Sequence, residues 1–140
     1  MKKEVTLKGL RKFNIIMGGF HLVQGLLMIV LGLALTDLGN FKLRIVQYYL
    51  EFIPNDDGGG ALVSASREIF TLPFFVLVAA FLLISALAHG LISLPNKINA
   101  MYNKDLEMGI NRLRWFEYAL SSSIMIVLIA YLFGVYDIAS

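Results

Sequence analysis

The sequence predicts an all-α membrane protein with three transmembrane helices and a short extracellular β-hairpin between the first two. Composition favours lipid, because 58% of the 140 residues are hydrophobic and only 16% are charged, whereas soluble domains average about a quarter charged residues. The chain also contains three apolar runs of about 23 residues, each long enough to cross a hydrocarbon core of about 30 Å. We therefore interpret residues 1–140 as a single membrane domain.

The first transmembrane helix is expected at residues 13–35. Lysines precede it, as in a secretory signal peptide, but the run is longer than the roughly 7–15 residues of a signal h-region and ends without a good cleavage site. Gly18, Gly25 and Gly32 recur every seven residues along it. Small residues on one stripe allow a neighbouring helix to approach closely. We predict a retained helix with a glycine packing seam.

The hairpin is expected within the loop at residues 38–70. Residues 41–53, FKLRIVQYYLEFI, are rich in β-branched and aromatic side chains, and the following PNDDGGG is a strong turn signal. Residues 61–70, ALVSASREIF, return as the partner strand. The three glycines lack the strand-to-helix context and the Lys-Ser/Thr pair of a phosphate loop, so they predict a plain turn.

The second and third helices are expected at residues 72–94 and 112–136, joined by a loop at 95–111. Pro73 near the start of the second helix and Pro95 just after it suit helix boundaries.

Charge sets the expected orientation, because basic residues prefer cytoplasmic segments. The segment between the first two helices is acidic on balance, whereas basic residues precede the first helix and separate the second from the third. This predicts a multi-pass protein of the cell membrane with a cytoplasmic N-terminus and an extracellular hairpin. The basic residues concerned are Lys2, Lys3, Lys8, Arg11 and Lys12, followed by Lys97, Lys104, Arg112 and Arg114.

Each predicted helix carries polar residues inside its apolar run, at a similar depth. At a rise of about 1.5 Å per residue they lie roughly 6–16 Å from the cytoplasmic end. Ionisable groups at this depth usually face a bundle interior or a hydrated cavity, so the shared depth predicts a polar cavity in the cytoplasmic half. The residues form three pairs, each on one helix face: His21 with Gln24, Ser85 with His89, and Glu117 with Ser121.

Each of these residues also has a simpler interpretation. Glu117 lies one turn from Arg114, and the two side chains could merely pair near the interface. A lone histidine on an apolar helix is more often a packing residue than a ligand, and serines in membrane helices bond back to carbonyls one turn earlier. Two histidines and one glutamate on separate helices are only a weak signal for a metal, and we assign no metal site.

The third helix carries RWFEYALSSSIMIVLIA at residues 114–130, with FHLVQG on the first helix and SALAHG on the second. Together these stretches resemble heliorhodopsin, the inverted-topology branch of the microbial rhodopsins. The resemblance covers the whole chain and the order of its features, and the Glu-Tyr-x-x-Ser-Ser-Ser of the third helix is its most specific element. It implies that the three helices belong to a seven-helix rhodopsin-like bundle.

The resemblance also implies roles for individual residues in a retinal-binding light sensor. Glu117 matches the carboxylate that is the counterion of the protonated retinal Schiff base. The cofactor implied is all-trans retinal, and the partners implied are the lipid bilayer and a second copy in a homodimer. Residues matching the wall of the retinal pocket are Tyr118, Ser121, Ser122 and Met125, and those matching a polar cavity on the cytoplasmic side are His21, Gln24, Ser85 and His89.

One departure from the family concerns lysine. In the family the lysine that binds retinal is on the seventh helix, whereas every lysine of this chain lies outside the three predicted spans. We therefore expect a truncated or partial product, or one piece of a split receptor whose remaining helices are on another polypeptide.

Two other classes of function stay open. One is a small three-helix proton channel or transporter subunit with a His21, His89 and Glu117 relay, for which Glu117→Gln would abolish proton flux without added retinal. The other is a structural assembly subunit, in which Gly25→Leu would disrupt partner binding. An enzyme is not expected, because no nucleophile, base and orienting group can be assembled, and the small net charge of +2 without a basic, aromatic stripe does not favour nucleic acid.

Overall fold

The computed structural model describes residues 6–140. Lys2 and Lys3, which contribute to the predicted N-terminal charge, lie outside the described residues. Three of the helices are long and apolar enough to cross a membrane, namely α1, α3 and α5. The elements in chain order are α1 (Leu7–Ala34), α2 (Thr36–Asn40), β1 (Lys42–Pro54), β2 (Gly60–Pro73), α3 (Phe74–Ser93), α4 (Asn96–Glu107) and α5 (Arg112–Leu132).

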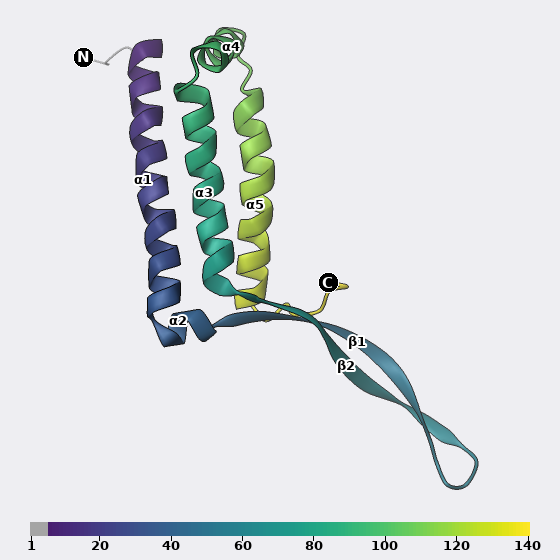
Figure 1. Ribbon diagram of the computed structural model, residues 1–140. Helices are drawn as coiled ribbons and strands as arrows, with labels where there is room; N and C mark the ends of the chain where they lie inside the picture. The colour runs from purple at the N-terminus through teal and green to yellow at the C-terminus, as the bar shows by residue number, and fades with distance from the viewer. Residues whose placement is uncertain (1–5) are drawn as a thin grey trace.

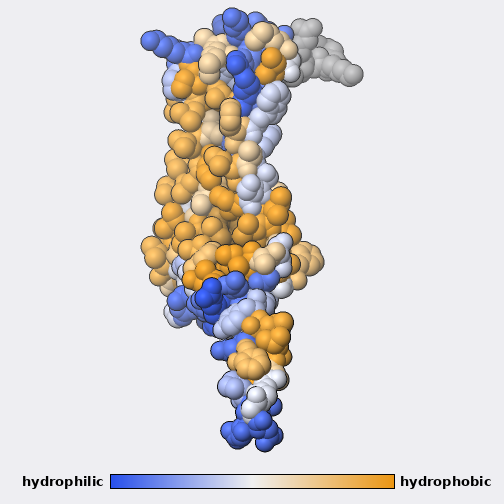
Figure 2. All heavy atoms as spheres, turned by 90° about the vertical axis from the view of Figure 1, so that its right-hand side faces the viewer, coloured by the Kyte–Doolittle hydropathy of each residue, from blue (hydrophilic) through white to orange (hydrophobic). Residues whose placement is uncertain are grey.

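The three long helices stand side by side, with α3 between α1 and α5 (Figure 1). The start of α1 and the short helix α4 lie at one end of this bundle, which we call the α4 end. The hairpin and the C-terminus lie at the other end, called here the hairpin end. On the face shown in Figure 2, hydrophobic side chains cover most of the helical part, and hydrophilic ones gather at both ends. This distribution is that of a multi-pass membrane protein.

The glycine seam predicted on α1 is confirmed. Gly18, Gly25 and Gly32 are the glycines of α1 that are buried, and all three face α3. A Cβ added at Gly18 would lie 3.0 Å from the Cβ of His89, and one added at Gly25 would lie 2.8 Å from Leu83. The seam therefore brings the two backbones together as close-packed membrane helices require.

The helix α1 begins earlier than the apolar run. Thr6 caps it by accepting a hydrogen bond from the Gly9 N–H at 3.1 Å, so the helix starts at Leu7 rather than at residue 13. Its first turns consequently carry Lys8, Arg11 and Lys12. Arg11 fastens this end to the junction of α3 and α4, through hydrogen bonds to the Ser93 carbonyl at 2.8 Å and to Asn96 Oδ1 at 2.9 Å.

The predicted hairpin is present as a two-stranded antiparallel sheet. Its strands of 13 and 14 residues exceed the usual strand length of about 3–10 residues, and the ribbon projects away from the bundle (Figure 1). The turn uses Gly58, whose positive φ of 80° suits glycine. The second strand continues to Pro73, so α3 starts at Phe74, two residues beyond the apolar boundary at 72.

Several contacts hold the base of the hairpin against the bundle. The Phe74 N–H donates to the Phe41 carbonyl at 2.9 Å, which joins the end of the hairpin to its beginning. The Tyr131 hydroxyl near the end of α5 donates to the Lys42 carbonyl at 3.0 Å. The C-terminal segment lies along β1, where Val46 exchanges backbone hydrogen bonds of 2.9 Å with Tyr136 and Ile138.

The segment between α3 and α5 contains the helix α4, where the sequence predicted only a loop. Its last turn is joined to α5 by Asp105, a buried carboxylate that accepts two hydrogen bonds from Arg112, at 2.6 and 3.0 Å. These bonds lower the pKa of Asp105 below its ordinary value, because they favour the charged carboxylate. The ion pair fixes the corner from which α5 enters the bundle.

Candidate functional site

A cavity of about 350 Å³ lies among α1, α3 and α5 towards the α4 end, and we call it the polar cavity. It brings together every site residue predicted from the sequence except Gln24. Phe81 and Arg114 line it in addition. Its lining residues are His21, Phe81, Ser85, His89, Arg114, Glu117, Tyr118, Ser121, Ser122 and Met125.

The helical spacing of the polar residues explains why they meet. Ser85 and His89 are both buried one turn apart on α3, and Glu117 and Ser121 are both buried one turn apart on α5. These two faces oppose each other, and Ser85 Oγ donates a hydrogen bond of 2.8 Å to Glu117 Oε1. The i to i+4 spacing puts each pair on one helix face, and the packing of α5 against α3 brings the two faces into contact.

Glu117 is the central ionisable group of the cavity. It is 6% exposed, and its Oε2 lies 3.3 Å from Nη1 of Arg114. This separation counts as an ion pair, yet Oε2 has no hydrogen-bond partner among the described residues, so the arginine faces the carboxylate without a well-directed N–H. A buried carboxylate oxygen without a donor can accept a hydrogen bond from a further cation.

Arg114 connects Glu117 to the other groups of the cavity. Its Nη1 lies 3.3 Å from His89 Nε2, and its Nη2 donates to the Tyr118 hydroxyl at 3.0 Å. Its guanidinium carbon lies 4.8 Å from the centre of the Tyr118 ring, which adds a cation–π contact. The sequence suggested Arg114 only as an interfacial partner of Glu117, whereas here it also contacts α3.

The two histidines stack on each other across α1 and α3. The ring centres of His21 and His89 are 5.7 Å apart, with 20° between the planes. His89 Nδ1 lies 3.1 Å from Oδ1 of Asn14, a buried residue of α1. His21 Nδ1 is buried and has no partner among the described residues. His89 therefore has neighbours on both nitrogens, while His21 keeps one nitrogen free.

Sequence reasoning missed Asn14, although a signal for it was present. Asn14 precedes Gly18 by four residues and His21 by seven, which places it on the face of α1 that carries the glycine seam. A polar residue on a seam of close contact is held near the opposite helix. Gln24, by contrast, is half-buried on α1 and does not line the polar cavity.

The three consecutive serines of α5 differ in their surroundings. Ser122 Oγ donates to the Tyr118 carbonyl, and Ser123 Oγ donates to the Ala119 carbonyl at 2.6 Å. These two follow the back-bonding interpretation of serine in membrane helices. Ser121 instead is buried against the bundle and lines the cavity.

One wall of the polar cavity is open within the described residues. Tyr118 and Met125 line the cavity but are 52% and 42% exposed. Among residues 6–140, no three His, Asp or Glu side chains lie close enough together to hold a metal ion. The arrangement is thus a polar pocket with an aromatic and apolar rim, centred on one carboxylate.

Comparison with known families adds the decisive observation, because residues 10–140 match the Heliorhodopsin family. The chain belongs to the heliorhodopsin family. The chain is therefore a rhodopsin-like membrane protein, and its family is one of photoreceptor-type proteins that implies a retinal chromophore at the level of the family. No curated protein matches the chain.

The residues that line the polar cavity are chemically compatible with a retinal chromophore. The volume of the cavity lies at the lower end of the range of about 300–1,000 Å³ for small-molecule pockets, and its open wall leaves room for further lining groups. Oε2 of Glu117, which accepts no hydrogen bond within the described residues, suits a cationic ligand group. No lysine is among the residues that line the cavity in the described part of the chain.

Proposed function

We propose that this chain supplies the counterion and the polar cavity of a heliorhodopsin light sensor. The observation that carries the proposal is the buried carboxylate of Glu117, which accepts one hydrogen bond from Ser85 and leaves Oε2 without a donor on the cavity wall. A carboxylate stays ionised at low dielectric only when positive charge is close. Arg114 supplies part of that charge, and a cationic chromophore would supply the rest.

The polar residues of the cavity, together with Tyr118 and Met125, have individual parts in this proposal. Bound retinal would supply a positively charged imine and a polyene that absorbs visible light. Glu117 would act as the counterion of the imine, and Ser85 would orient its carboxylate. The wall of the retinal pocket would be formed by Tyr118, Ser121, Ser122 and Met125, and the polar side of the cavity by His21, Ser85 and His89. Gln24, which does not line the cavity, would have no part in it.

The lysine that carries retinal would come from outside the walls described here. Since no lysine of residues 6–140 lines the polar cavity, we assign it to a helix that completes the open side of the bundle. In the full receptor this chain would form three of seven helices. The remaining helices would stand on the same or another polypeptide.

The proposal includes an orientation and an assembly. Lys and Arg side chains are more numerous at the α4 end than in the hairpin, which favours a cytoplasmic N-terminus and therefore an outer hairpin. The hairpin would contribute to a homodimer contact, because a projecting ribbon with exposed apolar residues suits an interface. These residues include Tyr48, Leu50, Phe52, Ile53 and Leu62.

One variant tests both of these points. The sequence contains no cysteine, so Asp57→Cys introduces a single thiol at the exposed hairpin tip. A membrane-impermeant maleimide added to intact cells is expected to label it, and the labelled protein in mild detergent is expected to have the mass of two copies. An unlabelled thiol that reacts only after lysis would reverse the orientation, and a monomeric mass would contradict the dimer.

The counterion role predicts a change of colour. The receptor, assembled with its remaining helices and all-trans retinal, is expected to show a visible band that hydroxylamine bleaches. Glu117→Gln is expected to shift this band to longer wavelength, because a neutral amide no longer holds positive charge at one end of the polyene. The measurement is the absorption spectrum, and Glu107→Gln, an exposed change on α4, is the matched control.

An unchanged spectrum in Glu117→Gln would contradict the counterion role. Proton flux in liposomes without retinal, abolished by the same variant, would instead favour the three-helix channel.

A further inference from the structure

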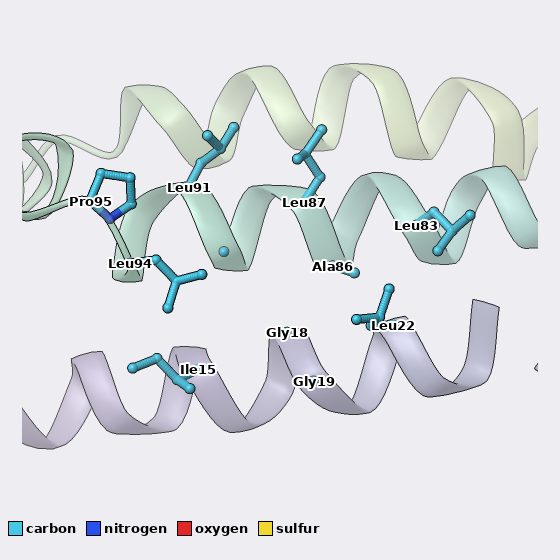
Figure 3. Close-up of a pocket in the computed structure, with 11 residues that line it drawn as sticks. Ile15, Gly18, Gly19, Leu22, Leu83, Ala86, Leu87, Leu91, Leu94 and Pro95 are labelled. Atoms are coloured by element: carbon cyan, nitrogen blue, oxygen red, sulfur yellow. The ribbon is translucent and has the colours of Figure 1, made fainter. Parts of the chain in front are cut away.

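A second cavity lies on a different face of the bundle, as a groove between α1 and α3. Its volume is about 720 Å³, and only carbon-rich side chains and glycines face it. In Figure 3, Ile15 and Leu94 lie across the gap from each other, and Gly18 and Gly19 leave the α1 side of it open. The lining residues are Ile15, Gly18, Gly19, Leu22, Leu83, Ala86, Leu87, Gly90, Leu91, Leu94 and Pro95.

The groove is separate from the polar cavity. Leu87 and Leu91 of the groove lie on the side of α3 opposite to Ser85 and His89, at 3.6 residues per turn. A face that points away from the polar interior of a membrane bundle meets lipid. The groove is therefore an apolar recess on the lipid side of α1 and α3.

The length of the groove matches one leaflet. It starts at Leu94 and Pro95, at the α4 end, and reaches Leu83. Eleven residues of helix separate Leu94 from Leu83, which at about 1.5 Å each spans roughly 17 Å. Half of a hydrocarbon core of about 30 Å is close to this length. The groove thus runs from one membrane surface to about the middle of the bilayer.

Positive charge gathers at the surface end of the groove. Lys8, Arg11 and Lys12 continue the α1 wall of the groove towards the N-terminus, and Lys97 follows Pro95 by two residues. Arg11 reaches the groove end directly, because its guanidinium bonds to the carbonyls of Ser93 and Leu94. None of these four side chains is paired with a carboxylate within residues 6–140.

We propose that this groove binds an anionic phospholipid, with one acyl chain between α1 and α3 and the phosphate among the basic residues. The apolar lining, the one-leaflet length and the charge at the surface end all correspond to the parts of such a lipid. Anionic headgroups gain about 1 kcal/mol per nearby Lys or Arg, and the recess adds burial of the acyl chain. The lipid would fill the space that the glycines leave and so brace the contact of α1 with α3.

Native mass spectrometry of the full chain tests the proposal. The protein is released from mild detergent that contains equal amounts of phosphatidylglycerol and phosphatidylcholine. We expect one phosphatidylglycerol per chain to be retained in preference to phosphatidylcholine. The retained fraction should fall as ionic strength rises before release, because salt screens the headgroup contact.

Gly19→Leu tests the acyl part of the site. A Cβ at Gly19 would meet no atom within 4 Å, so the leucine can fill the groove without separating the helices. We expect it to abolish lipid retention, whereas Val30→Leu, at an exposed position further along the same helix, should leave retention unchanged.

Lys12→Gln tests the headgroup part. We expect about fivefold weaker retention of phosphatidylglycerol, the equivalent of one lysine near an anionic surface. Lys42→Gln makes the same charge change at the hairpin end and should have no effect. Equal retention of the two lipids, unaltered retention in Gly19→Leu, or a protein dimer that Gly19→Leu dissociates would each overturn the proposal.

Discussion

Replacing Glu117 by alanine is expected to lower the free energy of unfolding of the bundle by about 3–5 kcal/mol, the usual cost of removing one partner of a buried ion pair. The side chain of Arg114 is only 17% exposed and would lose its carboxylate. Ser85 would lose the acceptor of its hydrogen bond. The measurement is denaturant unfolding in mixed micelles, with the midpoint and slope compared between variants.

Two further variants separate the parts of this effect. Glu117→Gln keeps an oxygen for Ser85 and removes only the charge, so its loss should be smaller than that of alanine. Glu107→Ala removes an exposed carboxylate of α4 and should change stability by no more than about 0.5 kcal/mol. If Glu117→Ala behaved like Glu107→Ala, the Arg114 pair would be a solvated surface contact and not part of a buried cavity.

Replacing Gly25 by leucine is expected to cost about 1–3 kcal/mol, as overpacking of a close contact does. A Cβ at Gly25 would lie 2.8 Å from Leu83 Cδ2 and 3.5 Å from Leu82 Cβ. Larger side chains therefore force α1 away from α3, which would also shift His21 relative to His89. Unfolding in mixed micelles measures the loss.

The matched control is the same substitution on the same helix, Gly19→Leu. The added Cβ has no neighbour within 4 Å there, and leucine favours a helix over glycine by up to about 1 kcal/mol. Gly19→Leu should therefore leave stability unchanged or raise it slightly. Equal destabilisation by both variants would mean that leucine disturbs α1 itself and that the seam is not a specific contact.

The spans and the seam were accessible from sequence because both follow from periodic patterns. Long apolar runs predict α1, α3 and α5, and glycines every seven residues return to the same helix face. The first residues of α1 and α3 could not be predicted from the apolar runs. Hydropathy does not reveal a helix cap such as Thr6 or a strand that continues to Pro73. The helix α4 was not predicted, because its polar sequence has none of the features of a membrane span.

The depth of the candidate cavity in the membrane could be predicted, but not which residues of α1 line it. Depth and spacing placed His21, Ser85 and Glu117 at one level, and these three do line the polar cavity. Rotation of α1 is fixed instead by contacts of its glycines with α3. Gln24 lies on the side of His21 away from that seam, which explains why it does not line the cavity although its depth is similar.

The contacts of Arg114 show a second limit of sequence reasoning. Spacing along α5 suggested its pairing with Glu117, three positions away. The contact with Tyr118, four positions away, is consistent with the same spacing but was found only in the structure. The contact of Arg114 with His89 depends on how α5 lies against α3. Contacts between helices of a bundle are set by tertiary packing, and one sequence alone does not encode them in a readable pattern.

The hairpin has a consequence for how α1 and α3 find each other. Residues 35–73, 39 in number, separate the two helices in the chain. A flexible linker of that length would impose a closure entropy that grows with the logarithm of its length. Here the ribbon pairs from Lys42 with Pro73 outward to its tip, and Phe74 is bonded to Phe41 at its base. The linker is already closed once the strands pair. Once the hairpin has formed, α1 and α3 are joined in effect by a short hinge. The entropic cost of docking one helix on the other then does not depend on the length of the hairpin.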